Sequence, residues 1–144
     1  MIDTLFNKLS YKEGQTIFVL KHPREFNELL ATVPQNIPVK KDIGEYDMVS
    51  FVIAFATNRN ELEALAQKVF PHLNEDAIVW MAYPQSNSEY YTNDFTIDAG
   101  WEVWAHYKML SVRQASINDE WSALCYRKTD YIKKINRQNS LGVK

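Results

Sequence analysis

Three runs of mostly apolar residues constrain the fold of this chain more than any other feature of its sequence. They are residues 17–20 (IFVL), 47–56 (DMVSFVIAFA) and 77–83 (AIVWMAY). Valine, isoleucine and phenylalanine favour strands, and a strand without polar alternation is buried on both faces. These runs therefore predict a parallel sheet with helices packed on both sides.

Helical patterns separate the apolar runs. In residues 23–32, Phe26 is followed by apolar residues three and four positions later. Asn58 and Glu61 have the spacing of a capping box and precede a second apolar stripe, and residues 94–107 carry a third. Strands that alternate with such helices predict right-handed crossovers between parallel strands.

The remaining strands are expected at the ends of the sheet. Residues 37–40 contain Pro38, which cannot donate a ladder hydrogen bond, so we expect this strand at an edge. Residues 111–117 and 121–127 flank a short polar turn, which predicts a hairpin. We therefore predict a three-layer, Rossmann-like α/β sheet of six strands in the spatial order 2-1-3-4-6-5, mostly parallel, with a C-terminal antiparallel hairpin.

Length and charge indicate one domain with a basic C-terminal segment. The 144 residues suit a single domain, which we place at residues 1–128. Residues 129–144 form a basic tail, and from residue 127 onward six basic residues stand against one acidic residue. We favour a solvated tail over one that binds nucleic acid, because so short a segment makes few phosphate contacts.

The sequence also bears on the compartment. The first residues lack the pattern of a signal peptide, and no apolar run is long enough to span a membrane. The single cysteine, Cys125, excludes an internal disulfide and favours a reducing compartment. We therefore expect a cytoplasmic protein without a membrane partner.

Longer stretches of the chain carry a resemblance to a known fold family. Residues 12–20 (KEGQTIFVL), 45–55 (EYDMVSFVIAF) and 62–80 (LEALAQKVFPHLNEDAIVW) resemble the class I methyltransferases. The likeness covers roughly residues 12–128 and implies a shortened methyltransferase-like fold, with one parallel strand missing between residues 40 and 47. It also implies a binding site for S-adenosylmethionine after the first strand.

A narrower resemblance is to a bacterial family of small domains of unknown function. It lies in Gly14-Gln15, in residues 80–84 (WMAYP) and in residues 119–124 (DEWSAL). In that family a lysine often follows the proline, whereas this chain has Gln85. The resemblance implies the fold and no particular activity.

Two departures from the methyltransferase pattern concern the cofactor. A cofactor loop needs glycines for close backbone approach, but Lys21, His22 and Pro23 occupy that position. Methyltransferases also tend to place an acidic residue at the end of strand two, and here Asp42 comes one position late. We therefore predict that the chain uses no cofactor, and a basic turn at Lys21 and His22 is explained by solvation more readily than by anion binding.

Candidate site residues gather where strands end, because ligands of open α/β sheets bind at the carboxyl edge. We expect any surviving small-molecule site among Lys21, His22, Thr57, Asn58, Tyr83, Gln85 and Ser86. No histidine or cysteine spacing suggests a metal site, and Cys125 is expected as a buried core thiol. We therefore predict no catalytic residue and no metal ligand.

Three functions remain open. We favour a non-catalytic binding or interaction domain on a degenerate cofactor-binding fold, with a protein or a small molecule as its partner. The alternative is a divergent S-adenosylmethionine-dependent methyltransferase, which is the only reading that includes a cofactor. A weaker alternative is nucleic-acid binding through the basic tail.

Overall fold

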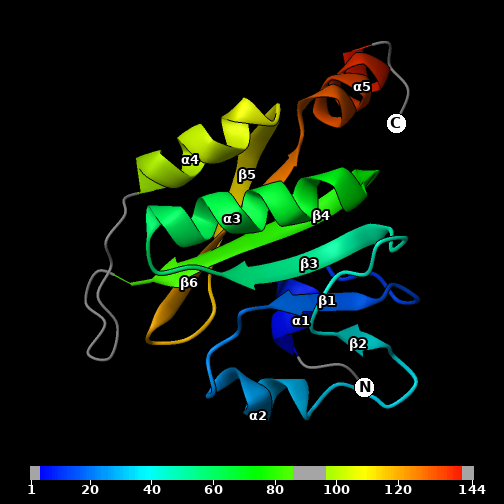
Figure 1. The fold of residues 1–144 in the computed structure, drawn as a ribbon. Helices are drawn as coiled ribbons and strands as arrows, with labels where there is room; N and C mark the ends of the chain where they lie inside the picture. Colours follow the sequence, from blue (N-terminus) through cyan, green and yellow to red (C-terminus); the bar gives the residue numbers. More distant parts are fainter. Residues whose placement is uncertain (1–3, 86–96, 141–144) are drawn as a thin grey trace.

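The computed structural model describes residues 4–85 and 97–140 of the chain and contains one six-stranded sheet (Figure 1). From one edge to the other the strands are β2 (Val39–Lys40), β1 (Ile17–Leu20), β3 (Val49–Phe55), β4 (Leu73–Pro84), β6 (Trp121–Lys128) and β5 (Met109–Ser116). The first four are parallel, and β6 is antiparallel to both of its neighbours. The predicted strand order and fold class are confirmed.

Helices cover both faces of this sheet (Figure 1). One face carries α1 (Thr4–Lys8) and α2 (Phe26–Leu30), and the other carries α3 (Arg59–Val69), which runs into the 3-10 turn η1 (Phe70–His72), and α4 (Ile97–His106). The last helix, α5 (Thr129–Ser140), follows β6 directly. Residues 41–48 join β2 to β3 without a strand, as the shortened fold requires.

The two faces of the sheet have separate cores, and alternation along β3 supplies both. Phe51 and Phe55 point toward α1 and α2, whereas Val52 and Ala54 point toward α3 and α4. All four side chains are buried. Each large apolar side chain that is buried contributes about 1.5–3 kcal/mol to the stability of the fold. Burial on both faces of the central strands therefore stabilises the packing of all three layers.

Polar contacts hold α1 on the sheet. The indole of Trp80, which is fully buried, donates from Nε1 to the carbonyl of Leu9 at 2.7 Å. Arg113 on β5 donates to the carbonyl of Lys8 at 2.8 Å and lies over the Trp80 ring at 5.2 Å. These bonds satisfy carbonyl groups at the end of α1 that have no partner within the helix.

The segment expected as a solvated basic tail forms α5 over most of its length. Two contacts join α5 to the domain: Lys134 lies 3.6 Å from Glu75, and Arg127 of β6 lies over the ring of Tyr131 at 4.6 Å. Tyr131 and Ile135 are four positions apart, a helical spacing that the sequence analysis did not use. Among the described residues, no helix has the length and apolar character needed to cross a membrane.

Candidate functional site

The connections of the two central strands define where a ligand can bind. Strand β1 leads to α2 on one face of the sheet, whereas its neighbour β3 leads to α3 on the opposite face. In open α/β sheets, ligands bind at such a topological switch point, beyond the carboxyl ends of the strands. Lys21 and His22 follow β1, and Thr57 and Asn58 follow β3, so the structure brings these four predicted residues to one edge.

Lys21 keeps the backbone turn for which this position usually needs glycine. Its φ is +58°, in the left-handed region, and its side chain is exposed. A residue with a Cβ in this conformation costs roughly 1–2 kcal/mol. The turn after β1 therefore contains one left-handed residue, although it contains no glycine.

Thr57 and Asn58 are joined to Glu61 at the start of α3. Asn58 is the N-cap residue, and its Oδ1 accepts a hydrogen bond from the Glu61 amide at 2.9 Å. One Glu61 carboxylate oxygen accepts from both the amide and the hydroxyl of Thr57, each at 2.7 Å. The two bonds from Thr57 lower the pKa of Glu61, so its negative charge stays at the N-terminus of α3. The predicted capping box is present, with the carboxylate bound one residue further back.

A second carboxylate, Asp42, lies at the same edge. Its pKa is lowered first by its bond from Lys68 and then by the amide of Ile43, and the charge of Lys21 adds to both. Lys21 also contributes to the lowered pKa of Glu61. The site therefore has two ionised carboxylates with Lys21 near both, and neither carboxylate was among the predicted site residues.

A shallow cavity lies beside these charges. It has a volume of about 180 Å³, and its walls include Leu20, Lys21, Asp42 and Lys68. Cofactor pockets are commonly about 300–1,000 Å³. The cavity is thus large enough for a ribose-sized group and too small for a complete nucleoside cofactor.

On the α2 side, aromatic rings fill the space at the edge. The rings of Phe26 and Phe55 are 5.1 Å apart, as are those of Phe55 and Trp121, and all three are buried. His22 continues this row, with its ring 6.3 Å from Phe26 and its Nε2 donating to Asn27 at 2.8 Å. Ligand access at the switch point is therefore on the α3 side.

The other predicted site residues lie elsewhere. Tyr83 is buried in the core, its hydroxyl accepts a bond from Gln114 at 2.8 Å, and burial raises its pKa. Gln85 donates to the carbonyl of Asn118 at 2.6 Å and so holds the turn between β5 and β6. Ser86 is outside the described residues.

Cys125 is a buried free thiol, as predicted. Burial raises its pKa to about 11, which opposes formation of the thiolate that a nucleophile needs. Within residues 4–85 and 97–140, no group of three or more histidine, cysteine, aspartate or glutamate side chains could hold a metal ion.

Comparison with known proteins shows which solved structures have a similar fold. No family model and no curated protein sequence matches the chain. Solved structures do match. LepI with S-adenosylmethionine has a TM-score of 0.54 at 10% identity, the glycopeptide N-methyltransferase MtfA with sinefungin has 0.57 at 8%, and a TehB-like S-adenosylmethionine-dependent methyltransferase from Corynebacterium glutamicum has 0.55 at 7%. The fold is Rossmann-like and similar to that of these methyltransferases.

The extent of the match differs among these proteins. The alignments cover 87% of this chain with LepI and MtfA and 86% with the Corynebacterium protein. They cover 39%, 91% and 85% of those chains, respectively. This chain thus spans about two fifths of LepI and most of the two methyltransferases.

One prediction is contradicted. We expected no cofactor, but the structures of this fold include complexes with S-adenosylmethionine, S-adenosylhomocysteine and sinefungin. The expectation rested on the missing glycines after β1 and on the late position of Asp42. Lys21 has a left-handed φ, so at this one position the chain adopts without a glycine a conformation that glycine adopts readily. The narrower resemblance to a bacterial family of small domains remains a prediction.

Proposed function

We propose that this domain binds S-adenosylmethionine at the switch point between β1 and β3 and acts as a divergent methyltransferase. The observation that carries the proposal is the pair of ionised carboxylates, Asp42 and Glu61, beside the left-handed turn at Lys21. The fold, shared with proteins solved in complex with such ligands, supports it.

The charges at the edge favour one class of ligand. S-adenosylmethionine carries a sulfonium cation and ribose hydroxyl groups, both of which carboxylates bind well. A nucleotide phosphate would instead meet the negative charge that Glu61 holds at the N-terminus of α3, where phosphates otherwise bind. Asp42 would take the ribose hydroxyls in place of Lys68, and its cavity has the size of a ribose.

The methyl-transfer step is a separate part of the proposal. The fold does not fix the reaction, and one similar structure is described as a pericyclic reaction enzyme. When bound, S-adenosylmethionine supplies an electrophilic methyl group. In this proposal, the residues of the chain bind and orient that methyl group at the carboxyl edge of the sheet.

Titration calorimetry tests the binding. We expect the purified full-length chain to bind S-adenosylmethionine, S-adenosylhomocysteine and sinefungin with a stoichiometry of one, and ATP much more weakly. Asp42→Asn should lower the affinity about tenfold, which is the loss expected from one charge-assisted hydrogen bond. Asp119→Asn, in the turn between β5 and β6, is the matched control and should leave it unchanged. Absence of heat with every S-adenosyl ligand at millimolar concentration would refute the proposal.

A second candidate is a non-catalytic interaction domain. The buried aromatic row of Phe26, Phe55 and Trp121 favours it, because it closes one side of the edge where a methyl acceptor could enter. This candidate predicts ligand binding without transfer of a labelled methyl group to any acceptor. Labelled products from a panel of amine, hydroxyl and carboxylate acceptors would exclude it.

A further inference from the structure

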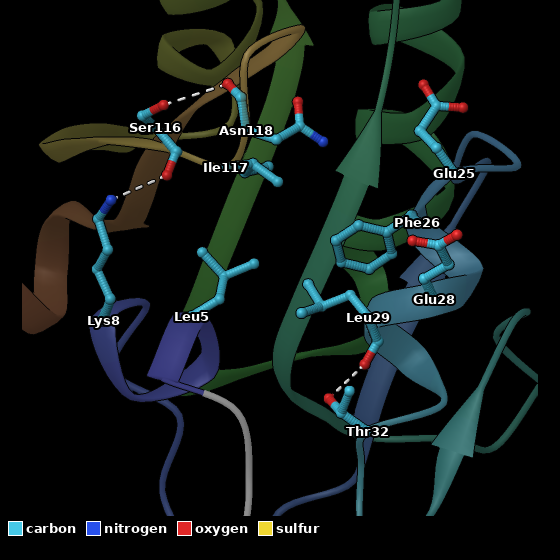
Figure 2. A pocket seen from close by; sticks show the side chains of 10 residues that line it. All are labelled: Leu5, Lys8, Glu25, Phe26, Glu28, Leu29, Thr32, Ser116, Ile117 and Asn118. Carbon is cyan, nitrogen blue, oxygen red and sulfur yellow. Dashed lines mark hydrogen bonds between the residues drawn. The ribbon is translucent and has the colours of Figure 1, made fainter.

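A groove much larger than the switch-point cavity lies on the opposite face of the sheet, between α1, α2 and the turn after β5 (Figure 2). We name it the α1–α2 groove and define it by its lining residues Leu5, Phe26, Glu28, Leu29, Ile117 and Asn118. Its volume is about 770 Å³, within the range of about 300–1,000 Å³ that is typical of small-molecule sites. The function proposed above does not use it.

The floor of the groove is apolar. Phe26 and Leu29 project from α2 toward α1, and Leu5 and Ile117 close the space from the other side (Figure 2). Leu5, Leu29 and Ile117 are only partly buried. A ligand with an apolar body would cover them, and each Å² of apolar surface removed from water contributes roughly 25 cal/mol.

Most polar groups at the rim already bond one another. The ammonium of Lys8 donates to the carbonyl of Ser116 at 2.9 Å, and the hydroxyl of Thr32 donates to the carbonyl of Leu29 at 2.6 Å. The hydroxyl of Ser116 donates to the carbonyl of Asn118 at 3.3 Å. The Thr32 and Ser116 hydroxyls thus donate their protons within the protein, and the Lys8 ammonium is held at the α1 side of the groove.

Two other polar groups at the rim, the Glu28 carboxylate and the side-chain amide of Asn118, differ from these bonded groups. In the part of the chain that the structure describes, the Glu28 carboxylate has no ion pair, and it belongs to the lining of the groove (Figure 2). The Oδ1 of Asn118 accepts from the amides of Glu120 and Trp121 at 2.8 and 2.9 Å. That fixes the amide plane, so the Asn118 NH₂ group projects over the space between α1 and α2 (Figure 2). The rim thus offers one acceptor with negative charge and one fixed donor.

We propose that the α1–α2 groove binds small amphiphilic ammonium compounds that also carry a carbonyl group. The apolar body covers the floor, the ammonium donates to Glu28, and the carbonyl accepts from Asn118. Glu28, with Glu25 nearby, makes the α2 side of the rim negative and favours a cation there, whereas the Lys8 ammonium lies at the α1 side. An exposed ion pair alone is weak, so affinity requires the apolar body as well as the charge.

Phenylalaninamide contains all three elements and is the probe for a test by ¹⁵N NMR and calorimetry on the full chain. We expect millimolar or tighter binding, with shifts in the amide signals of Phe26, Leu29 and Asn118. Alaninamide, which lacks the apolar body, and N-acetylphenylalaninamide, which lacks the charge, should each bind at least about threefold more weakly. Binding should not require an S-adenosyl ligand, so this test is independent of the function proposed above.

Glu28→Gln should weaken phenylalaninamide binding about threefold, as expected for an exposed ion pair. Glu45→Gln removes an exposed carboxylate outside the groove and should change nothing. Leu29→Trp fills the groove and should abolish binding while the circular dichroism of the chain is retained. The inference is overturned if phenylalaninamide does not bind, if its N-acetyl derivative binds equally well, or if Glu28→Gln binds like the unmodified chain.

Discussion

Single residues at the carboxyl edge decide how this chain departs from a glycine-loop protein. Lys21 and Lys108 have the same left-handed φ of +58°. Lys108 follows the end of α4, where a left-handed residue is a common helix terminator. Lys21 lies between β1 and α2 at the switch point, and under the proposed function its strained turn borders the ligand.

The two lysines therefore form a matched pair for substitution. Lys21→Gly and Lys108→Gly should each stabilise the fold by about 1 kcal/mol, since glycine adopts this conformation without a Cβ clash. Thermal unfolding should shift upward by about 2–4 °C in both variants. Lys21→Gly keeps the left-handed turn and removes a cation beside Asp42 and Glu61, so both variants should retain S-adenosyl binding. Loss of binding in Lys21→Gly alone would contradict this account of the turn.

The buried hydroxyl of Tyr126 reduces the stability of the core. Its side chain is fully buried and stacks on Trp104 with ring centroids 5.6 Å apart, but its hydroxyl has no hydrogen-bond partner among the described residues. Tyr126→Phe should therefore raise the free energy of unfolding by about 1 kcal/mol or more. Tyr83→Phe removes a hydroxyl that is bonded to Gln114 and should lower it by about 1 kcal/mol. Urea unfolding of both variants measures the difference, and a destabilised Tyr126→Phe would show that the hydroxyl is satisfied in solution.

Cys125 gives the fold a dependence on alkaline pH. Burial raises its pKa to about 11, above the value of an unfolded thiol, so the folded state retains the proton longer than the unfolded state. Its contribution to stability is complete below the unfolded pKa and is lost as the pH rises through about 11. Alkylation by iodoacetamide should accelerate only as the pH approaches 11 in the native chain. Rapid alkylation of folded protein near neutral pH would contradict the burial.

At the scale of elements, short sequence patterns correctly predicted the features that depend on neighbouring residues. The Asn58–Glu61 spacing predicted the start of α3, and Pro38 predicted an edge strand, because both depend on hydrogen bonds within a few residues. Helix α2 is shorter than its apolar spacing suggested: residues 24–25 form a turn, and Pro34 follows the helix. The missed helix α5 had a signal in the four-residue spacing of Tyr131 and Ile135, and the prediction of a tail rested on charge alone.

The cap of α3 can be tested directly. Asn58→Ala should destabilise the fold by about 0.5–2 kcal/mol, because the Glu61 amide loses its acceptor. Asn60→Ala changes an exposed residue of the same type within the helix and should have little effect. Equal unfolding free energies for the two variants would show that the cap contributes nothing.

Glu61 adds a pH dependence to the same element. Its folded pKa is lowered by Thr57, so its contribution to stability is present above the unfolded pKa of the carboxyl and is lost as the pH falls through the folded value. Glu61→Gln should reduce the loss of stability on acidification. Thermal unfolding of both proteins between neutral and acidic pH measures this, and parallel curves would contradict it.

At the scale of the whole molecule, the strand order was predictable and the use of the site was not. Double-sided burial of three strands, an edge proline and a closing hairpin leave few arrangements of six strands. The cofactor prediction was wrong because glycine content and the position of one acidic residue were taken to decide cofactor binding, whereas structures that share this fold at low sequence identity include complexes with S-adenosyl ligands. The α1–α2 groove was beyond sequence reasoning, since Leu5, Phe26 and Ile117 meet only after folding.

The most direct test of the central proposal locates the ligand. Addition of S-adenosylhomocysteine to ¹⁵N-labelled protein should shift the amide signals of Lys21, Asp42 and Thr57 and leave those of Leu5 and Leu29 unchanged. Binding that shifts only the α1–α2 groove, or no shift at millimolar ligand, would contradict an S-adenosyl site between β1 and β3.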